Sequence, residues 1–90
     1  MISALVLLNT DINASQDGVL ENIKQVKSVQ EAHSLFGVYD LLVKVKAASI
    51  DELKNITNAC KRVAGVISSF TLMIDDHEDA INLSASPRGI

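Results

Sequence analysis

Alternating apolar and polar residues predict four β-strands. Residues 2–9 form a dense apolar run with the length of a strand that is buried on both faces. Alternation with a period of two predicts further strands over 29–36, 40–47 and 66–74. The segments 29–36 and 40–47 are separated only by a short connector that begins at Gly37, which predicts a β-hairpin with a tight turn.

Apolar residues spaced three and four positions apart predict two helices between these strands. The first covers residues 16–27 and has Ser15 or Asn13 as its N-cap. The second begins at a capping box over residues 49–52, in which a serine is followed three positions later by glutamate. Gly65 is placed to end this helix.

The predicted order of elements is β-α-β-β-α-β. Residues 20–23 read Leu-Glu-Asn-Ile and recur as Leu-Lys-Asn-Ile at 53–56, which is consistent with two related β-α-β halves. This order is typical of the α+β ferredoxin-like fold, an antiparallel four-stranded sheet with both helices on one face. We therefore expect one sheet face to lack a helical cover.

The helix-free face of the predicted sheet is too apolar for a soluble monomer. Its apolar members are Leu5 and Leu7 of the first strand, Leu42 of the third, and Ile67 and Met73 of the fourth. Lys44 and Lys46 share the side of Leu42, so we expect them near an edge of the sheet. Since monomers rarely expose large apolar patches, the pattern predicts a dimer in which two sheets pack face to face.

Composition and charge narrow the classes of protein that fit this fold. The chain has 90 residues, of which 48% are hydrophobic and 3% aromatic, so an aliphatic core in one small domain over 1–74 is expected. Residues 1–74 carry seven basic and seven acidic side chains, while residues 75–90 form an acidic, partly frayed extension. A neutral body with an acidic tail argues against direct nucleic-acid binding. No apolar run is long enough to span a membrane as a helix, so we expect a cytoplasmic protein.

Neither a catalytic constellation nor a structural metal site stands out. His33 falls within a predicted strand, where a structural or surface role is the simpler interpretation. His77 lies in the acidic segment 75–79, which is either a solvated tail or a set of oxygen ligands for a divalent cation. Cys60 lies on the apolar face of the second helix and fits a small buried side chain. No cofactor motif is present, so none is expected.

One constellation has the chemistry to bind a zwitterion. Residues 37–40 read Gly-Val-Tyr-Asp and place exposed backbone amides beside a carboxylate, which suits a ligand that carries both a carboxylate and an ammonium group. Ser68, Ser69 and Thr71 add hydroxyl groups on the last strand. The structural alternative is that Gly37 makes the turn, the aspartate caps it and the tyrosine packs.

These residues carry a resemblance to a known family. The stretch 35–45, with its turn at 37–40, resembles the Gly-x-Tyr/Phe-Asp turn and strand of the Lrp/AsnC ligand-binding domain, also called the RAM domain. Residues 48–54 resemble the entry of that domain into its second helix. Residues 63–66 and 69–73 are similar to its final helix-to-strand segment.

The resemblance, which covers residues 2–74, implies a function that spacing alone does not. Subunits of this family pair through their sheets and assemble into higher rings, here expected to be an octamer, and amino acids or related metabolites bind between dimers. The implied ligand-binding residues are Gly37, Tyr39, Asp40, Ser69 and Thr71, with Leu35 and Phe36 lining the pocket.

The first predicted strand begins at residue 2, so we expect no helix-turn-helix domain before it. The chain therefore resembles the stand-alone members, which sense a small-molecule effector or assemble with full-length Lrp/AsnC regulators of transcription. We expect a homo-oligomer without enzymatic activity. Two alternatives stay open: a small dimeric enzyme of the monooxygenase or isomerase type, and an assembly or metal-sensing protein that acts through the acidic tail.

Overall fold

A computed structural model describes residues 1–74 of the chain. The acidic extension and His77 lie outside the described residues, so the interpretations placed on them stay predictions. The elements follow the predicted order and are β1 (Ile2–Thr10), α1 (Gln16–Lys24), β2 (Val29–Ser34), β3 (Leu41–Ala47), α2 (Ile50–Lys61) and β4 (Val66–Ile74).

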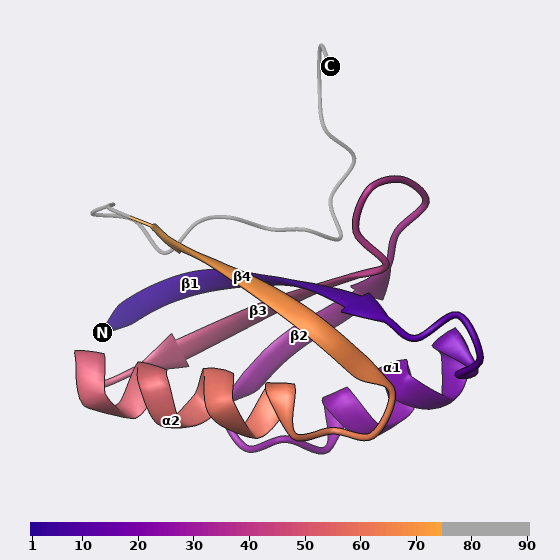
Figure 1. Cartoon of the computed structure of the whole chain (residues 1–90). Helices are drawn as coiled ribbons and strands as arrows, with labels where there is room; N and C mark the ends of the chain where they lie inside the picture. The colour runs from indigo at the N-terminus through magenta and orange to yellow at the C-terminus, as the bar shows by residue number, and fades with distance from the viewer. Residues whose placement is uncertain (75–90) are drawn as a thin grey trace, which may run out of the picture.

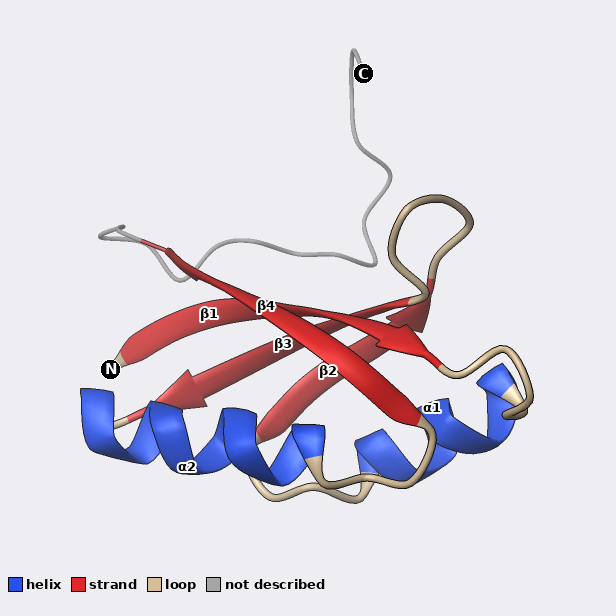
Figure 2. Ribbon diagram, viewed as in Figure 1, coloured by secondary structure: helices blue, strands red, loops and turns tan. Residues whose placement is uncertain are grey.

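The four strands form one antiparallel sheet in the order β2-β3-β1-β4. Both helices lie against the same face of this sheet, and the other face has no helical layer (Figures 1 and 2). The predicted ferredoxin-like fold is thereby confirmed. Strands β1 and β3 lie inside the sheet, whereas β2 and β4 are its edges.

Both helices begin at the residues that the sequence indicates. The Ser15 hydroxyl accepts a hydrogen bond from the backbone N–H of Gly18 at 3.1 Å, which leaves Asn13 outside the cap. At α2 the Ser49 hydroxyl accepts from the N–H of Glu52 at 3.1 Å, and the Glu52 carboxylate accepts from the N–H of the residue before the cap. The capping box therefore occupies N–H groups that a helix leaves without an internal partner.

Helix α1 is shorter than predicted. It ends at Lys24 rather than at residue 27, and Ser28 adopts a left-handed backbone with φ of 75°. Val26 still packs against the core from the connecting turn, so its apolar periodicity continues beyond the last helical hydrogen bonds. For this reason the side-chain pattern overestimates the helix length by one turn.

The hairpin connection is longer than predicted. Strand β2 ends at Ser34 and β3 begins at Leu41, so a six-residue loop, residues 35–40, joins them (Figure 1). The backbone of Gly37 does not adopt a positive φ, which rules out the tight glycine turn that the sequence suggests. We call residues 35–40 the β2–β3 loop.

The core lies between the sheet and the two helices. Alternate residues of β1 and β3 point into it and meet one face of each helix. The buried residues are Ala4, Val6, Leu8, Val19, Ile23, Ala32, Leu41, Val43, Val45, Ala47, Leu53, Ile56 and Cys60. This core is aliphatic, as the composition predicts.

A β-bulge reverses the predicted faces of β4 after Ile67. Thr10 pairs with Val66 and Asn9 with Ser68, so Ile67 is an extra residue between two consecutive pairs. An extra residue moves every following side chain of a strand to the other face. The prediction that Met73 lies on the helix-free face is therefore wrong, because Met73 pairs with the inward-facing Ala4. Ile67 has no partner in β1, so the face predicted for it stays a prediction.

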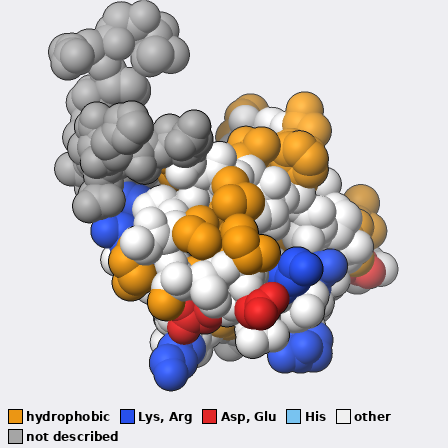
Figure 3. Space-filling model, turned by 90° about the vertical axis from the view of Figure 1, so that its left-hand side faces the viewer, with side chains coloured by type: hydrophobic (Ala, Val, Ile, Leu, Met, Phe, Trp, Pro, Cys, Tyr) orange, Lys and Arg blue, Asp and Glu red, His pale blue; other side chains and the backbone are white. Residues whose placement is uncertain are grey.

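The helix-free face instead takes Phe70, Leu72 and Ile74 from β4, which pair with Leu7, Leu5 and Ser3 of β1. Together with Leu42 of β3, these side chains form the apolar face, which we define as Leu5, Leu7, Leu42, Phe70, Leu72 and Ile74. In the space-filling view of Figure 3, hydrophobic side chains gather toward the upper, helix-free part, and most charged side chains lie lower.

Lys44 is not near an edge of the sheet, which corrects a second prediction. It lies on the inner strand β3, with Leu5 of β1 on one side and Glu31 of β2 on the other, and it is only 8% exposed. The helix-free face thus has an apolar part on β1 and β4, which Leu42 of β3 extends, and a charged part around Glu31 and Lys44 of β2 and β3. Within residues 1–74, no helix is long and apolar enough to cross a membrane.

Candidate functional site

The β2–β3 loop is closed at its base by backbone hydrogen bonds. The N–H of Leu35 donates to the carbonyl of Asp40 at 2.8 Å, which joins the first and last residues of the loop. The N–H of Asp40 donates to the carbonyl of Leu8 at 2.9 Å and so ties the loop to β1. The loop rises from the end of the sheet on the side away from the helices (Figure 2).

The carboxylate of Asp40 adds a second tie to β1. Its Oδ2 atom accepts a hydrogen bond from the backbone N–H of Thr10 at 2.7 Å and lies 3.2 Å from the Thr10 hydroxyl, which donates to it. Asp40 therefore has the capping role that the structural alternative assigns to it. Both of these hydrogen bonds use Oδ2, so the capping role occupies one of the two carboxylate oxygens.

A side chain that the sequence analysis did not single out also holds this base. Gln16, the first residue of α1, donates from Nε2 to the carbonyl of Asp40 at 2.8 Å and to that of Leu35 at 3.4 Å. Thr10 was likewise not predicted to take part. A polar residue at a helix start or a strand end carries no local signal for such contacts, because they depend on tertiary packing.

The tip of the loop is apolar and exposed. Phe36 and Val38 are almost entirely open to solvent. Tyr39 turns back instead, and its ring stacks on that of Phe70, with the centroids 6.4 Å apart and the planes at 15°. The tyrosine thus links the loop to the apolar face of the sheet.

The predicted hydroxyl ligands lie apart from this loop. Ser69 and Thr71 pair with Leu8 and Val6, on the face that carries the helices, whereas Phe70 between them faces the other way. Asp40 borders β1 on the β3 side and Ser69 borders it on the β4 side, a separation of two strand spacings, or roughly 10 Å. No hydrogen bond within residues 1–74 joins either hydroxyl to the loop.

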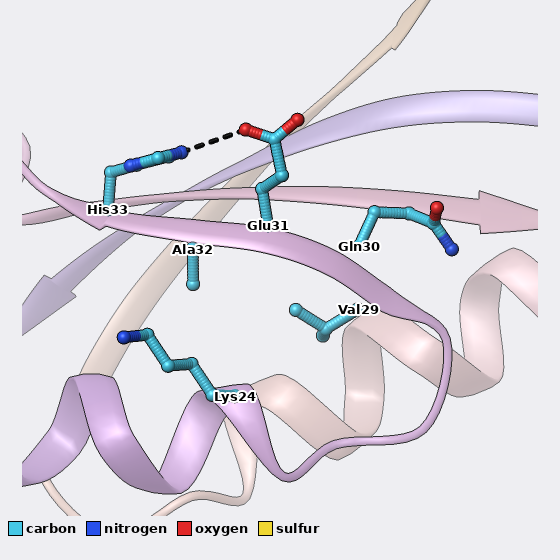
Figure 4. A pocket seen from close by; sticks show the side chains of 6 residues that line it. All are labelled: Lys24, Val29, Gln30, Glu31, Ala32 and His33. Atoms are coloured by element: carbon cyan, nitrogen blue, oxygen red, sulfur yellow. Dashed lines mark hydrogen bonds and ion pairs between the residues drawn. The ribbon is translucent and has the colours of Figure 1, made fainter. Parts of the chain in front are cut away.

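A cavity of about 380 Å³ lies elsewhere, beside the open edge of β2, and its lining residues are Lys24, Val29, Gln30, Glu31, Ala32 and His33. As Figure 4 shows, His33 Nε2 lies 3.0 Å from Glu31 Oε1 above the strand, while Lys24 comes from α1 below it. Lys24 also lies 3.4 Å from Glu21. Lys24, Glu31 and His33 thus each have a polar partner within the chain.

Burial of Cys60 predicts a thiol of low reactivity. The side chain is fully buried, and desolvation raises the pKa of its thiol from 9.0 to about 11. At pH 8 about one molecule in a thousand therefore carries the thiolate, the form that reacts. We expect the folded protein to resist a thiol reagent such as DTNB at pH 8 and to react fully in denaturant. Rapid labelling of the native protein would contradict this burial.

The raised pKa of Cys60 also determines how its contribution to folding stability changes with pH. Folding favours the neutral thiol, so the contribution of Cys60 is fully present below about pH 9 and is lost as the pH rises toward the folded value of about 11.

Comparison with known proteins identifies one family and a fold shared with several solved structures. Residues 3–75 match the family described as the Lrp/AsnC ligand binding domain. Over 73 residues the chain is 36% identical to a homocitrate synthase of Sulfolobus acidocaldarius; the match covers 81% of the chain and 16% of that enzyme. The chain thus spans about one sixth of the length of the curated relatives it matches.

Two solved structures show the extent of the structural likeness. A protein of Thermus thermophilus is 30% identical, with a TM-score of 0.74, and the match covers 98% of this chain and 100% of that one. The Escherichia coli AsnC structure is 20% identical, with a TM-score of 0.77, over 90% of this chain and 54% of that one. This second likeness shows the fold alone.

Proposed function

The chain belongs to the Lrp/AsnC ligand binding domain family, and we propose that it senses an amino acid or a related small metabolite at an interface between dimers. The site is the β2–β3 loop of one subunit, completed by a second subunit. The observation that carries this proposal is the loop itself, which has a firmly tied base and an exposed apolar tip. Such a tip is covered only when another molecule reaches it.

Gly37 supports the same interpretation. Its backbone does not need the freedom of glycine, and a Cβ atom at this position would meet nothing within 4 Å. The fold of one chain therefore does not require glycine here. A glycine between exposed residues leaves the backbone open to close approach by a ligand or a neighbouring subunit.

The ligand chemistry follows from the residues at the loop. We propose that Asp40 Oδ1 accepts from the ammonium group and that backbone N–H groups at Gly37 take the carboxylate. The side chains of Leu35, Phe36 and Tyr39 surround the apolar part. Because Ser69 and Thr71 lie across β1 from Asp40, we propose that these two hydroxyls contribute from another subunit of the assembly.

Assembly is part of the proposed function. The apolar face on β1 and β4 suits a dimer in which two sheets pack together, and dimers then form a ring, for which we propose an octamer. Ligand binding between dimers favours one arrangement of the ring over others. We further propose a cytoplasmic protein that assembles with full-length Lrp/AsnC regulators and does not itself bind DNA, since residues 1–74 are electrically neutral.

The match to homocitrate synthase favours a second candidate partner. Because a segment of that enzyme is similar to this chain, we propose as an alternative that the chain regulates a homocitrate synthase rather than a transcription regulator. Sedimentation of the chain with each partner from the same organism separates the two possibilities. Both candidates are non-catalytic, in keeping with a family described as ligand-binding.

Within residues 1–74, no group of three His, Cys, Asp or Glu side chains could hold a metal ion.

The direct test is calorimetry of the full chain with each common amino acid at millimolar concentration. For the amino acid that binds, Asp40→Asn should weaken affinity by about 1.5–3 kcal/mol, because a hydrogen bond to a charged group is lost. Asparagine keeps an acceptor for Thr10, so the loop base remains. Asp51→Asn, which removes the same charge in the first turn of α2, should leave the affinity unchanged.

Two results would overturn the proposal at different levels. If no amino acid gives heat with the wild-type chain, the ligand class is wrong. If one binds and Asp40→Asn binds it equally well, the ammonium group does not contact this carboxylate.

A further inference from the structure

We propose that Gln16 is a positioning residue of the effector site, because its side-chain amide closes the base of the β2–β3 loop and thereby orders the loop before a ligand arrives. This inference rests on the proposed function, since it names a residue that acts on the same site without contacting the ligand.

The side chain of Gln16 forms hydrogen bonds with both ends of the loop. The amide nitrogen of Gln16 has two hydrogen atoms, and its two acceptors are the carbonyls of the first and last loop residues, Leu35 and Asp40. The distance of 2.8 Å to Asp40 is that of a good hydrogen bond, and the distance of 3.4 Å to Leu35 is that of a weaker one.

The rest of the loop has few restraints of its own. Among the described residues, no hydrogen bond holds the backbone of 36–39, and the only ring contact from this segment is that of Tyr39 with Phe70. The order of the tip therefore depends on its base. Ordering a loop during binding costs conformational entropy, so a loop fixed beforehand binds more tightly.

Gln16 also connects the loop to a rigid element. It directly follows the capping residue of α1, and the same helix buries Val19 and Ile23 in the core. Thr10 ties only the last loop residue to β1, whereas Gln16 ties both ends to the helical layer. A displacement of the start of α1 would therefore move the loop, and a displacement of the loop would move the start of α1.

The test is Gln16→Glu in the full chain, which keeps the shape of the side chain and removes the two N–H donors. A carboxylate in the first turn favours the helix dipole, so loosening of the loop would not come from a weakened helix. The matched control is Gln25→Glu at the other end of α1, where the exposed side chain has no described contact with the loop. Gln16→Lys retains donors and serves as the rescue variant.

Two measurements read the result. Amide hydrogen exchange followed by NMR needs no ligand, and we expect the Leu35 and Asp40 amides to exchange about threefold to tenfold faster in Gln16→Glu, while core amides are unchanged. Calorimetry with the same panel of amino acids should then show a loss of affinity of similar size. Gln16→Lys should recover part of both effects, and Gln25→Glu should show neither.

Each contrary outcome has a distinct meaning. Unchanged exchange at Leu35 and Asp40 would overturn the positioning role, as would equal acceleration throughout the core, which indicates general destabilisation. Faster loop exchange with unchanged affinity would show that loop order does not serve binding. If the wild-type chain binds no amino acid, the proposed function fails, while the exchange measurement still decides whether Gln16 orders the loop.

Discussion

Replacing Leu72 with glutamate is expected to convert the proposed sheet-to-sheet dimer into a 9.7 kDa monomer. Leu72 lies on the apolar face opposite Leu5, and its side chain is 43% exposed in the single chain. In a face-to-face dimer both copies of the new carboxylate would be buried without a partner. An unpaired buried charge costs about 3–5 kcal/mol, so the dissociation constant should rise at least a hundredfold. Sedimentation equilibrium at micromolar concentration measures the change.

The matched control is Met73→Glu, at the neighbouring position on the same strand. Met73 is more exposed than Leu72, but the bulge at Ile67 places it on the helical side, where it pairs with Ala4. We expect this variant to keep the mass of the wild-type assembly. Dissociation by Met73→Glu but not by Leu72→Glu would restore the face assignment made from strict alternation. A wild-type chain that is monomeric at micromolar concentration would contradict the sheet-to-sheet dimer itself.

The contrast between Leu72 and Met73 shows what periodicity predicts and where it fails. Alternation located β4 correctly, because every second residue of a strand shares a face whichever face that is. It assigned the face wrongly, because one unpaired residue, Ile67, changes the register and leaves no mark in the apolar pattern. The prediction that Lys44 lies near an edge of the sheet is wrong for a related reason. Its charge indicates an exposed position, but the strand order that buries it depends on long-range pairing.

In the candidate site, too, the sequence indicates some residues, whereas others depend on the tertiary structure. Residues 37–40 stand out in the sequence as a candidate site because the Gly-Val-Tyr-Asp segment is contiguous and chemically distinctive. The residues that hold it, Thr10 and Gln16, are 30 and 24 positions from Asp40 and belong to other elements. Their contribution depends on where β1 and α1 meet the loop. The separation of Asp40 from Ser69 was also outside the reach of sequence, since it requires the position of β1 between β3 and β4.

Gly65→Ala is expected to destabilise the fold by about 3 kcal/mol. Gly65 has a φ of 97°, which costs about 1–2 kcal/mol for a residue with a Cβ atom. That atom would lie 2.7 Å from Val19 Cγ2 and 3.1 Å from Ala14 Cβ, and such overpacking typically costs a further 1–3 kcal/mol. The chain has little room to relax, because the carbonyl of Gly65 accepts from the N–H of Asp11 at 2.7 Å. Urea unfolding followed by circular dichroism gives the difference in free energy.

Gly18→Ala is the control for this change, and it should have the opposite sign. Gly18 is helical, and a Cβ there would lie 3.4 Å from the Ser15 hydroxyl, so alanine should stabilise the protein by about 0.5–1 kcal/mol. Equal stability of the two variants would show that the contact between Gly65 and α1 is not tight. Since Ala14 and Val19 lie close to Gln16 in the sequence, the strain at Gly65 should also reach the proposed effector site. We therefore expect Gly65→Ala, unlike Gly18→Ala, to accelerate exchange of the Leu35 amide beyond its loss of global stability.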